Sequence, residues 1–152
     1  PVTALYIQSD YCQVHANSAM RLAFWGKTIE VSLNSLVYID LINKEKGIKE
    51  RYEVNFPRNS VNNLLFGKAM NFTHFGDIIC RNLDTDEQCI CKVTGSSGLF
   101  LKERDKGKII GHVIPKGCGA PKYRVSGSWL THLKVAKFDS KKNDWGEETM
   151  VY

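Results

Sequence analysis

The sequence lacks the long apolar segment that a membrane-spanning helix requires. No run of about 18 apolar residues occurs, and the apolar runs are short pieces such as Asn63-Leu64-Leu65-Phe66. A basic and apolar leader is also missing, and the first residue is Pro1 rather than Met. We therefore expect a soluble protein, and we expect this chain to be a piece of a longer one.

Paired cysteines are missing as well. The five cysteines are odd in number and none lies in a CxxC spacing, which argues against a disulfide framework and against a structural zinc site. A reducing, cytoplasmic location fits this usage best. Cys89 and Cys91 lie two apart on a predicted strand, so we expect them to share a face and to pack as buried thiols.

Spacings that support catalysis or metal binding are also missing. The histidines are scattered without an HxxH or HExxH pattern, at His15, His74, His112 and His132. The Lys-Gly-x-Gly stretch at 116–119 lacks a Walker pattern and a following helix, so it is predicted to be a loop. The sequence predicts a protein that is not an enzyme, with no metal site and no cofactor.

Composition is that of an ordinary folded domain. Hydrophobic residues make up 43% of the 152 residues and charged residues 24%, which is far from the mixture typical of disordered chains. The 21 Lys and Arg residues exceed the 16 Asp and Glu residues, giving a net charge of +5. This charge favours anionic partners, either lipid headgroups or nucleic acid, and does not choose between them.

Short β-branched and aromatic runs separated by turn residues recur along the whole chain, whereas helical periodicity is hard to find. A clear example of alternation is the segment 51–56, which places Tyr52, Val54 and Phe56 on one face and polar residues on the other. Strands are predicted at 2–7, 14–25, 27–33, 36–42, 48–56, 61–70, 77–83, 88–94, 108–114 and 123–130.

The predicted connections are short and rich in turn residues, at 43–47, 84–87, 104–107 and 116–121. Parallel neighbours would need crossovers of a dozen or more residues, so the strands are expected to form an antiparallel meander. A sheet of this many twisted strands curls, and a wide barrel encloses more space than its own side chains fill. The fold class predicted is therefore all-β, an antiparallel meander forming a large, incomplete β-barrel with room for an apolar guest.

Several segments resemble the ligand-binding domain of the oxysterol-binding protein family. The opening Pro1-Val2-Thr3-Ala4-Leu5-Tyr6 is similar to the end of that family's His-His-Pro-Pro signature and the residues after it. The most specific segment is Phe24-Trp25-Gly26-Lys27-Thr28-Ile29-Glu30-Val31, which matches a family stretch F-W-G-K-S-hydrophobic-E-hydrophobic.

Further matches follow in the same order. They are Val61-Asn62-Asn63-Leu64-Leu65-Phe66-Gly67-Lys68, Gly76-Asp77-Ile78-Ile79-Cys80-Arg81-Asn82, Cys89-Ile90-Cys91-Lys92-Val93, Lys108-Ile109-Ile110-Gly111-His112-Val113 and Val125-Ser126-Gly127-Ser128-Trp129. Asn62 departs from the pattern, since many members have His there. The match covers residues 1–139, predicted as the barrel portion, and leaves 140–152 as a polar C-terminal segment.

The resemblance implies a lipid-binding function. Family members bind sterol, phosphatidylinositol 4-phosphate or phosphatidylserine in a barrel under an N-terminal lid and exchange these lipids between membranes. It implies that the chain begins inside the signature, with the histidine pair before Pro1 and the C-terminal phosphate ligands beyond Tyr152. It also implies that Pro1 and Thr3 lie near the phosphate-binding mouth and that Val61 and Leu64 lie on a strand lining the lumen. Transient contact with an anionic membrane surface, in the cytoplasm or at membrane contact sites, is expected.

Two other classes stay open at this stage. A basic, β-rich nucleic-acid-binding module would need exposed aromatics flanked by Arg or Lys along one groove, and no such stripe is visible, so no nucleic acid is expected. A barrel fragment used only for protein contacts is the other. Trp25 and Trp129 are predicted to be core residues, and the role of Trp145 is left open. Basic residues near hairpin turns are interpreted as a solvated face, with docking to anionic lipid as the alternative.

Overall fold

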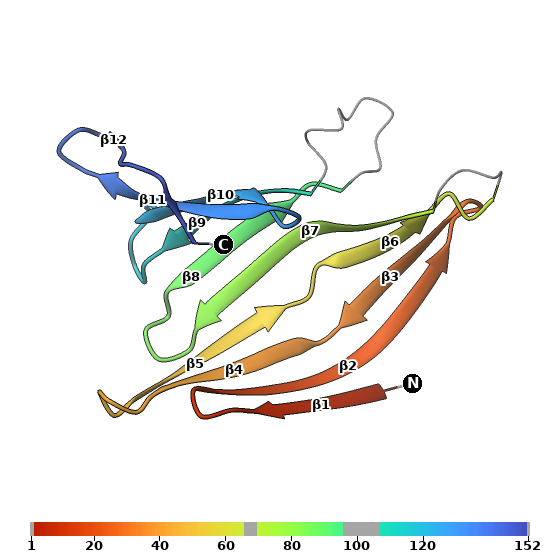
Figure 1. Cartoon of the computed structure of the whole chain (residues 1–152), viewed down its shortest axis with the longest axis horizontal. Helices are drawn as coiled ribbons and strands as arrows, with labels where there is room; N and C mark the ends of the chain where they lie inside the picture. Colours follow the sequence, from red (N-terminus) through yellow and green to blue (C-terminus); the bar gives the residue numbers. More distant parts are fainter. Residues whose placement is uncertain (1, 66–69, 96–106, 152) are drawn as a thin grey trace.

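The computed structural model describes residues 2–65, 70–95 and 107–151. These residues form thirteen strands and no helix, so none of them provides a helix able to span a membrane (Figure 1). The strands are β1 Val2–Gln8, β2 Cys12–Phe24, β3 Thr28–Asn34, β4 Leu36–Asn43, β5 Ile48–Asn55, β6 Arg58–Asn62, β7 Asn71–Asn82, β8 Gln88–Val93, β9 Lys108–Ile114, β10 Tyr123–Ser128, β11 His132–Asp139, β12 Asp144–Trp145 and β13 Thr149–Met150.

The sheet is a meander, as predicted. β3 and β4 form one long strand beside β2, because Asn34 faces Ala19 and Val37 faces Ala16 in one continuous register. Ser35 is the single residue between the two strands. β5 and β6 are likewise two parts of one strand, which pairs with β3 and β4 on one side and with β7 on the other. Every pairing is antiparallel. With β3–β4 and β5–β6 each counted as one strand, the paired strands are neighbours along the chain, except that β13 pairs with β11 past β12.

The ladder between β3–β4 and β5–β6 contains a bulge, with the extra residue on the β3–β4 side. Leu36 faces Asn55, whereas Val31, five residues earlier, faces Asn59, only four residues later, so the register shifts by one residue. The shift coincides with Pro57, which has no N–H for the ladder. Bulges bend and twist a strand, and β5 and β6 change direction at this point (Figure 1).

Register places most of the apolar strand residues on one side of the sheet, here called the apolar face. Residues that face each other across a ladder share a side, so parity can be followed from strand to strand. The apolar face carries Leu5, Ile7, Val14, Ala16, Met20, Leu22, Phe24, Ile29, Val31, Leu33, Val37, Ile39, Tyr52, Val54, Val61, Phe72, Ile78, Cys80, Cys89, Cys91, Val93, Ile109, Val113, Val125, Leu133 and Val135.

The opposite side, the polar face, carries most of the charged and amide side chains of the strands. Among them are His15, Asn17, Arg21, Glu30, Asn34, Asp40, Arg51, Glu53, Asn55, Arg58, Asn62, Arg81, Lys92, Arg124 and Lys134. The predicted alternation in 51–56 is confirmed for Tyr52 and Val54, which share the apolar face, while Phe56 follows the end of β5.

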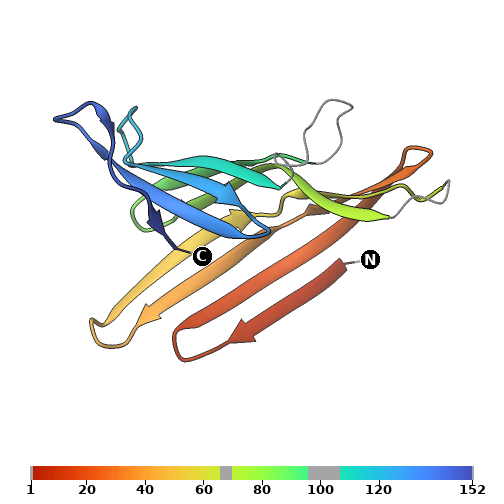
Figure 2. The same ribbon diagram turned by 45° about the horizontal axis from the view of Figure 1, so that its top comes forward.

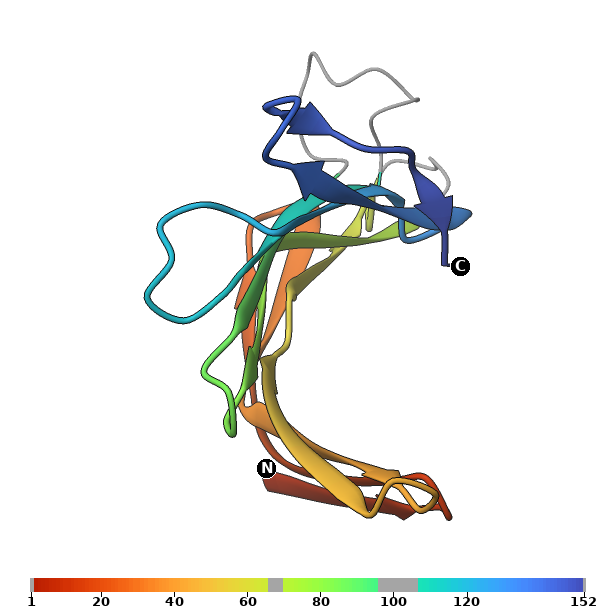
Figure 3. The same cartoon turned by 90° about the vertical axis from the view of Figure 1, so that its left-hand side faces the viewer.

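The sheet curls toward its apolar face. Side chains converge on the inner side of a curved sheet, and Val93 on the apolar face is 3% exposed while Ile90 on the other side of the same strand is 38% exposed. The indole of Trp129, just after β10, lies 4.5 Å from the ring of His74 on β7, a contact that a flat sheet would not allow. Two views show the resulting open gutter (Figures 2 and 3).

The gutter does not close among the described residues. β1 pairs with β2 alone, and β12 and β13 pair with β11 alone. An incomplete barrel is therefore the observed architecture. The segment predicted to be a polar tail pairs back onto β11, and its Trp145 lies 5.2 Å from the Phe138 ring with the Arg124 guanidinium over it.

Some strand predictions were wrong. The predicted strand 61–70 corresponds to the end of β6, and the structure ends that strand at Asn62 because Asn63 adopts a left-handed conformation with φ of 64°. Thr-His-Phe at 73–75 belongs to β7, which begins six residues earlier than expected, at Asn71. β11 was missed because its Lys134 and Lys137 obscure the alternation.

A buried carboxylate on the polar face links β4 to β5. Asp40 is 1% exposed, and it accepts hydrogen bonds from Arg51 Nε at 2.6 Å and Arg51 Nη2 at 2.9 Å. Lys49 Nζ lies 3.0 Å from Oδ2 of Asp40, the oxygen that also accepts the hydrogen bond from Arg51 Nη2. The bidentate guanidinium holds the pKa of Asp40 well below its usual range, against the opposing effect of burial.

Replacing Asp40 by Asn should lower the free energy of unfolding by about 1–3 kcal/mol near neutral pH, because two cations lose their shared anion. A folded pKa below the unfolded value near 4 means that this stabilisation is present above about pH 5 and is lost as pH falls. Urea unfolding at pH 7 and pH 3 measures the difference, which should shrink at pH 3. Asp10→Asn is the matched control, because its ion pair with Lys44 is exposed and should change little. A wild-type advantage that is equal at both pH values would contradict the role of the carboxylate charge.

Candidate functional site

The inner side of the gutter is the candidate site. Its apolar face is buried where β8 and β9 meet and becomes exposed toward β1, β2 and β3, where Leu5, Met20 and Leu22 are open to solvent. A contiguous exposed apolar surface of this kind marks a binding surface for a ligand or a partner. The exposed apolar side chains come from several strands, among them Leu5 on β1, Met20 on β2 and Leu41 on β4, so the register between strands assembles this surface.

The described site residues predicted from the sequence fall on or beside this face. Thr3 faces Ser18 and shares the side of Leu5, and Val61 lies between Ile29 and Phe72 across the two ladders. Leu64 was expected on the same strand, but it lies two residues beyond β6, where its N–H donates to the Lys27 carbonyl at 3.1 Å. Pro1 lies outside the described residues.

The middle of the apolar face is filled by thiols and glycine. The Sγ atoms of Cys89 and Cys91 lie 3.6 Å apart, and Cys80 faces Cys89 across the ladder. These residues are half-buried free thiols, as predicted for Cys89 and Cys91. Burial raises the pKa of Cys80, so its thiol stays protonated and behaves as a small apolar side chain.

Gly111 is required for this close packing. A Cβ built at Gly111 would lie 2.4 Å from Cys91 Sγ and 2.6 Å from the Ile90 carbonyl oxygen. Gly107 plays a similar role at the start of β9, because a Cβ there would lie 2.7 Å from Nε1 of Trp129. Its bare backbone lets the indole lie across β9 and reach His74, whose Nδ1 is 2.5 Å from Asn59 Oδ1.

The two tryptophans predicted as core residues differ in the structure. Trp129 is half-buried and packs against His74. The prediction for Trp25 was wrong, since its side chain is 69% exposed in the turn between β2 and β3. A glycine beside a tryptophan indicated a strand core, but here Gly26 has φ of 65° and forms the turn itself.

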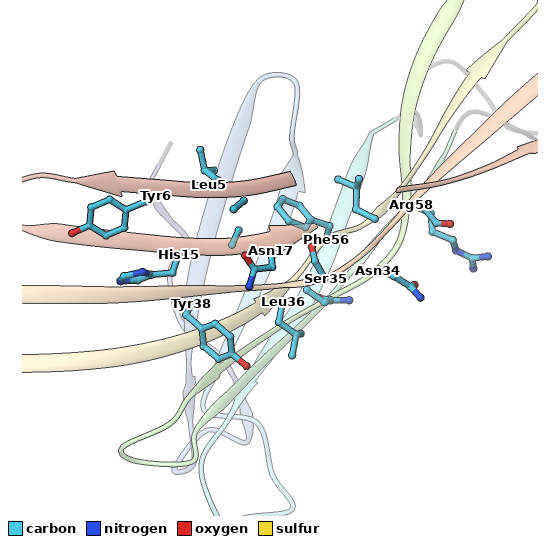
Figure 4. A pocket seen from close by; sticks show the side chains of 15 residues that line it. Leu5, Tyr6, His15, Asn17, Asn34, Ser35, Leu36, Tyr38, Phe56 and Arg58 are labelled. Atoms are coloured by element: carbon cyan, nitrogen blue, oxygen red, sulfur yellow. The ribbon is translucent and has the colours of Figure 1, made fainter. Parts of the chain in front are cut away.

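A second hollow lies on the polar face and is not part of the gutter. It has a volume of about 1110 Å³ and surrounds the junction of β3 with β4 and of β5 with β6. Tyr6 and His15 lie with ring centroids 4.9 Å apart at one side of it, and Arg58 lies at the other (Figure 4). His15 and Asn17 alternate with the apolar residues Val14 and Ala16 along β2, and this pattern is the signal in the sequence that could have indicated the polar lining.

Neither surface brings together a set of metal ligands among the described residues. Among residues 2–65, 70–95 and 107–151, no three His, Cys, Asp or Glu side chains are placed to hold a metal ion. Of the buried polar groups, Asp40 is paired with Arg51 and Lys49, and Ser60 is hydrogen-bonded to Thr73 at 2.8 Å.

Comparison with known proteins agrees with this geometry. The family model described as oxysterol-binding protein matches residues 1–150. The chain belongs to the oxysterol-binding protein family. It is 25% identical over 137 residues to oxysterol-binding protein 11 of Dictyostelium discoideum, covering 90% of the chain and 22% of that protein. It is 23% identical over 129 residues to human oxysterol-binding protein-related protein 7, covering 85% of the chain and 14% of that protein.

Solved structures show the same fold. The Osh1 ORD domain, determined in complex with ergosterol and again with cholesterol, superposes with a TM-score of 0.78 at 20% identity, covering all of this chain and 34% of the other. The Osh3 ORD from Saccharomyces cerevisiae, in complex with PI(4)P, gives a TM-score of 0.69 at 16% identity, covering 98% of this chain and 37% of the other. The oxysterol-binding family chain described here thus spans about a fifth or less of its curated relatives and about a third of these domains.

The packing of the apolar face yields a stability test. Gly111→Ala should lower the free energy of unfolding by at least about 1–3 kcal/mol, because the added methyl group meets backbone as well as the Cys91 thiol. Gly119→Ala is the matched control, since a Cβ there meets nothing within 4 Å. Thermal or urea unfolding measures both. Adding Cys91→Ala should restore little, because the Ile90 carbonyl still obstructs the methyl group, and full restoration would contradict this account.

Proposed function

We propose that this chain forms part of the wall of a lipid-binding cavity and that, as part of a larger domain, it binds a membrane lipid and transfers it between membranes. The ligand class is sterol, a phosphoinositide such as phosphatidylinositol 4-phosphate, or phosphatidylserine. The proposal rests on membership of the oxysterol-binding protein family and on related domains determined with ergosterol, cholesterol and PI(4)P.

The observation that carries the proposal is the segregation of side chains by the register. The apolar face runs from β1 to β9. In the ladders that join β2, β3 and β6, where Met20, Val31 and Val61 lie, this face carries no charged side chain. Each Å² of apolar ligand surface buried there contributes about 25 cal/mol. Glu50 is a charged residue on this face, and its carboxylate accepts a hydrogen bond from the Tyr52 hydroxyl at 2.6 Å.

Four residues are proposed as lipid contacts. Val61 and Thr3 are supported by their register on the inner face, and Leu64 by its half-buried position next to that face. Pro1 is proposed from the family resemblance alone. Capture of the ligand needs no covalent step, so the proposed activity is binding and transfer rather than enzymatic catalysis.

The setting proposed is the cytoplasm, with peripheral and transient contact at membranes or membrane contact sites. Five free thiols agree with a reducing compartment. A net charge of +5 agrees with an anionic membrane surface as the transient partner.

A pair of substitutions on β2 tests the proposal. Met20 lies on the inner face opposite Leu33, and its neighbour Ala19 lies on the outer face, where both are exposed. Met20→Asp should weaken binding of a fluorescent sterol, delivered in cyclodextrin without membranes, by about tenfold or more, because a carboxylate would be buried against the ligand. Ala19→Asp should leave binding within about twofold.

Phosphatidylinositol 4-phosphate and phosphatidylserine, supplied as short-chain soluble forms, distinguish the ligand classes in the same format. Equal effects of the two substitutions on every ligand would contradict an inner-face site. These measurements use the complete domain that contains this chain, and no saturable binding of any of the lipids by that domain would contradict the proposed function itself.

A further inference from the structure

Three of the five cysteines meet on the inner side of the gutter. Cys80 lies on β7, and Cys89 and Cys91 lie on β8, which pairs with β7 on one side and with β9 on the other (Figure 1). Cys80 faces Cys89 across the ladder, and the Sγ atoms of Cys89 and Cys91 are 3.6 Å apart. These three residues are called here the thiol cluster.

The thiol cluster differs from a set of core cysteines in its exposure. A cysteine that is completely buried is inert, whereas all three of these side chains are half-buried. Cys91 faces Gly111 on β9, and its Sγ lies where a Cβ of residue 111 would be, 2.4 Å away. Because Gly111 has no side chain to cover Cys91 from β9, the thiol stays open to a small reagent.

The contact between Cys89 and Cys91 makes one of the two sulfurs reactive. A hydrogen bond from the Cys89 thiol lowers the pKa of Cys91 below its ordinary value, and the same hydrogen bond, together with burial, raises the pKa of Cys89. The thiolate is the nucleophilic form of cysteine. Cys91 is therefore the nucleophile of the cluster, with the protonated Cys89 as its neighbour.

Spacing decides where a disulfide fits best. Residues two apart on one strand have Cα atoms roughly 6.6–6.8 Å apart, at the upper limit for a disulfide. Facing residues of an antiparallel pair have Cα atoms about 4.5–5.5 Å apart, which lies within the usual range. A bond between Cys89 and Cys91 would thus distort β8, whereas a bond between Cys80 and Cys89 would fit the ladder as it stands.

We propose that the thiol cluster is an oxidation site for hydroperoxides, in which Cys91 is oxidised first and the stable product is a disulfide between Cys80 and Cys89. In the first step the Cys91 sulfur attacks the terminal oxygen of the hydroperoxide and the O–O bond breaks. Cys91 becomes a sulfenic acid, and the remaining oxygen leaves with the thiol proton as an alcohol or as water. In the second step the Cys89 sulfur displaces the sulfenic hydroxyl as water and forms a disulfide with Cys91.

The third step is a thiol–disulfide exchange. The Cys80 sulfur attacks the Cys89 sulfur, and Cys91 leaves and takes the proton of Cys80. A thiol of low pKa is the better leaving group, and the exchange relieves the distortion of β8. Two electrons have then passed from Cys80 and Cys89 to the hydroperoxide, and Cys91 is again a free thiol. This site goes beyond the proposed lipid function and does not depend on it.

Tryptic peptides distinguish the two disulfides. Cleavage at Arg81 places Cys80 in the peptide 69–81 and places Cys89 and Cys91 together in the peptide 82–92. The complete domain that contains this chain is treated with hydrogen peroxide or cumene hydroperoxide, its remaining thiols are alkylated, and its peptides are followed by mass spectrometry. The disulfide within 82–92 should form first. The two peptides joined through Cys80 and Cys89, with Cys91 alkylated, should follow.

Substitutions test the role of each sulfur. Cys91→Ser should slow the joining of the two peptides by about tenfold or more, because the nucleophile is lost while both bonded sulfurs remain. Cys80→Ser should stop the reaction at the disulfide within 82–92. Cys118→Ser is the matched control, because Cys118 is an exposed thiol outside the cluster, and it should leave the rate within about twofold. Equal rates in the wild type and in Cys91→Ser would overturn the assignment, as would faster oxidation of Cys118 than of the cluster.

Unfolding gives a measurement that needs no substitution. In urea Cys91 should be oxidised no faster than Cys118, because the hydrogen bond from Cys89 belongs to the folded sheet. An advantage of Cys91 that persists in urea would contradict its origin in the fold.

The two hydroperoxides identify the source of the oxidant. Faster reaction with cumene hydroperoxide indicates an apolar hydroperoxide such as that of a lipid, and faster reaction with hydrogen peroxide indicates one dissolved in water. No disulfide within the cluster after either treatment would overturn the proposal.

Discussion

The backbone ladder of this sheet fixes which side of the gutter every side chain occupies. Because the side-chain period along a strand is two, a slip of one residue between β2 and β3 would exchange Met20 and Leu22 for Arg21 and Ala23 on the inner face. Such a slip would bury charge and expose apolar surface along the whole strand, which makes the observed register strongly preferred. The separation of an apolar inner face from a polar outer face, and hence the candidate binding surface, follows from this one constraint.

Curvature then turns an apolar face into a cavity wall. The bulge at Pro57 bends β5 and β6, and Gly107 allows Trp129 to reach His74 across β9. Where the curl is tight, near Cys91 and Gly111, side chains fill the inner side completely. Where it is open, near Leu5 and Met20, the apolar surface is left uncovered.

The charged residues have a separate distribution that the apolar pattern does not dictate. On the outer face they are tied into local pairs, of which the cluster of Asp40 with Arg51 and Lys49 is the buried example. Glu148 makes a similar contribution near the C-terminus, where it lies 3.1 Å from Arg124 and 3.3 Å from Lys134 and fastens the last strand over β11.

The sequence by itself determined the strand-rich class, the antiparallel meander, the shared face of Cys89 and Cys91, and the family, because alternation, turn residues and short motifs are local properties of the chain. It misplaced the end of β6, the start of β7 and the environment of Trp25, since these depend on the conformations of Asn63 and Gly26 rather than on hydrophobic pattern. It also missed β11, whose pairing with β10 outweighs its weak alternation. Only the tertiary structure decided which apolar residues face inward and which residues line the hollow on the polar face, because both depend on register and curvature between strands far apart in the chain.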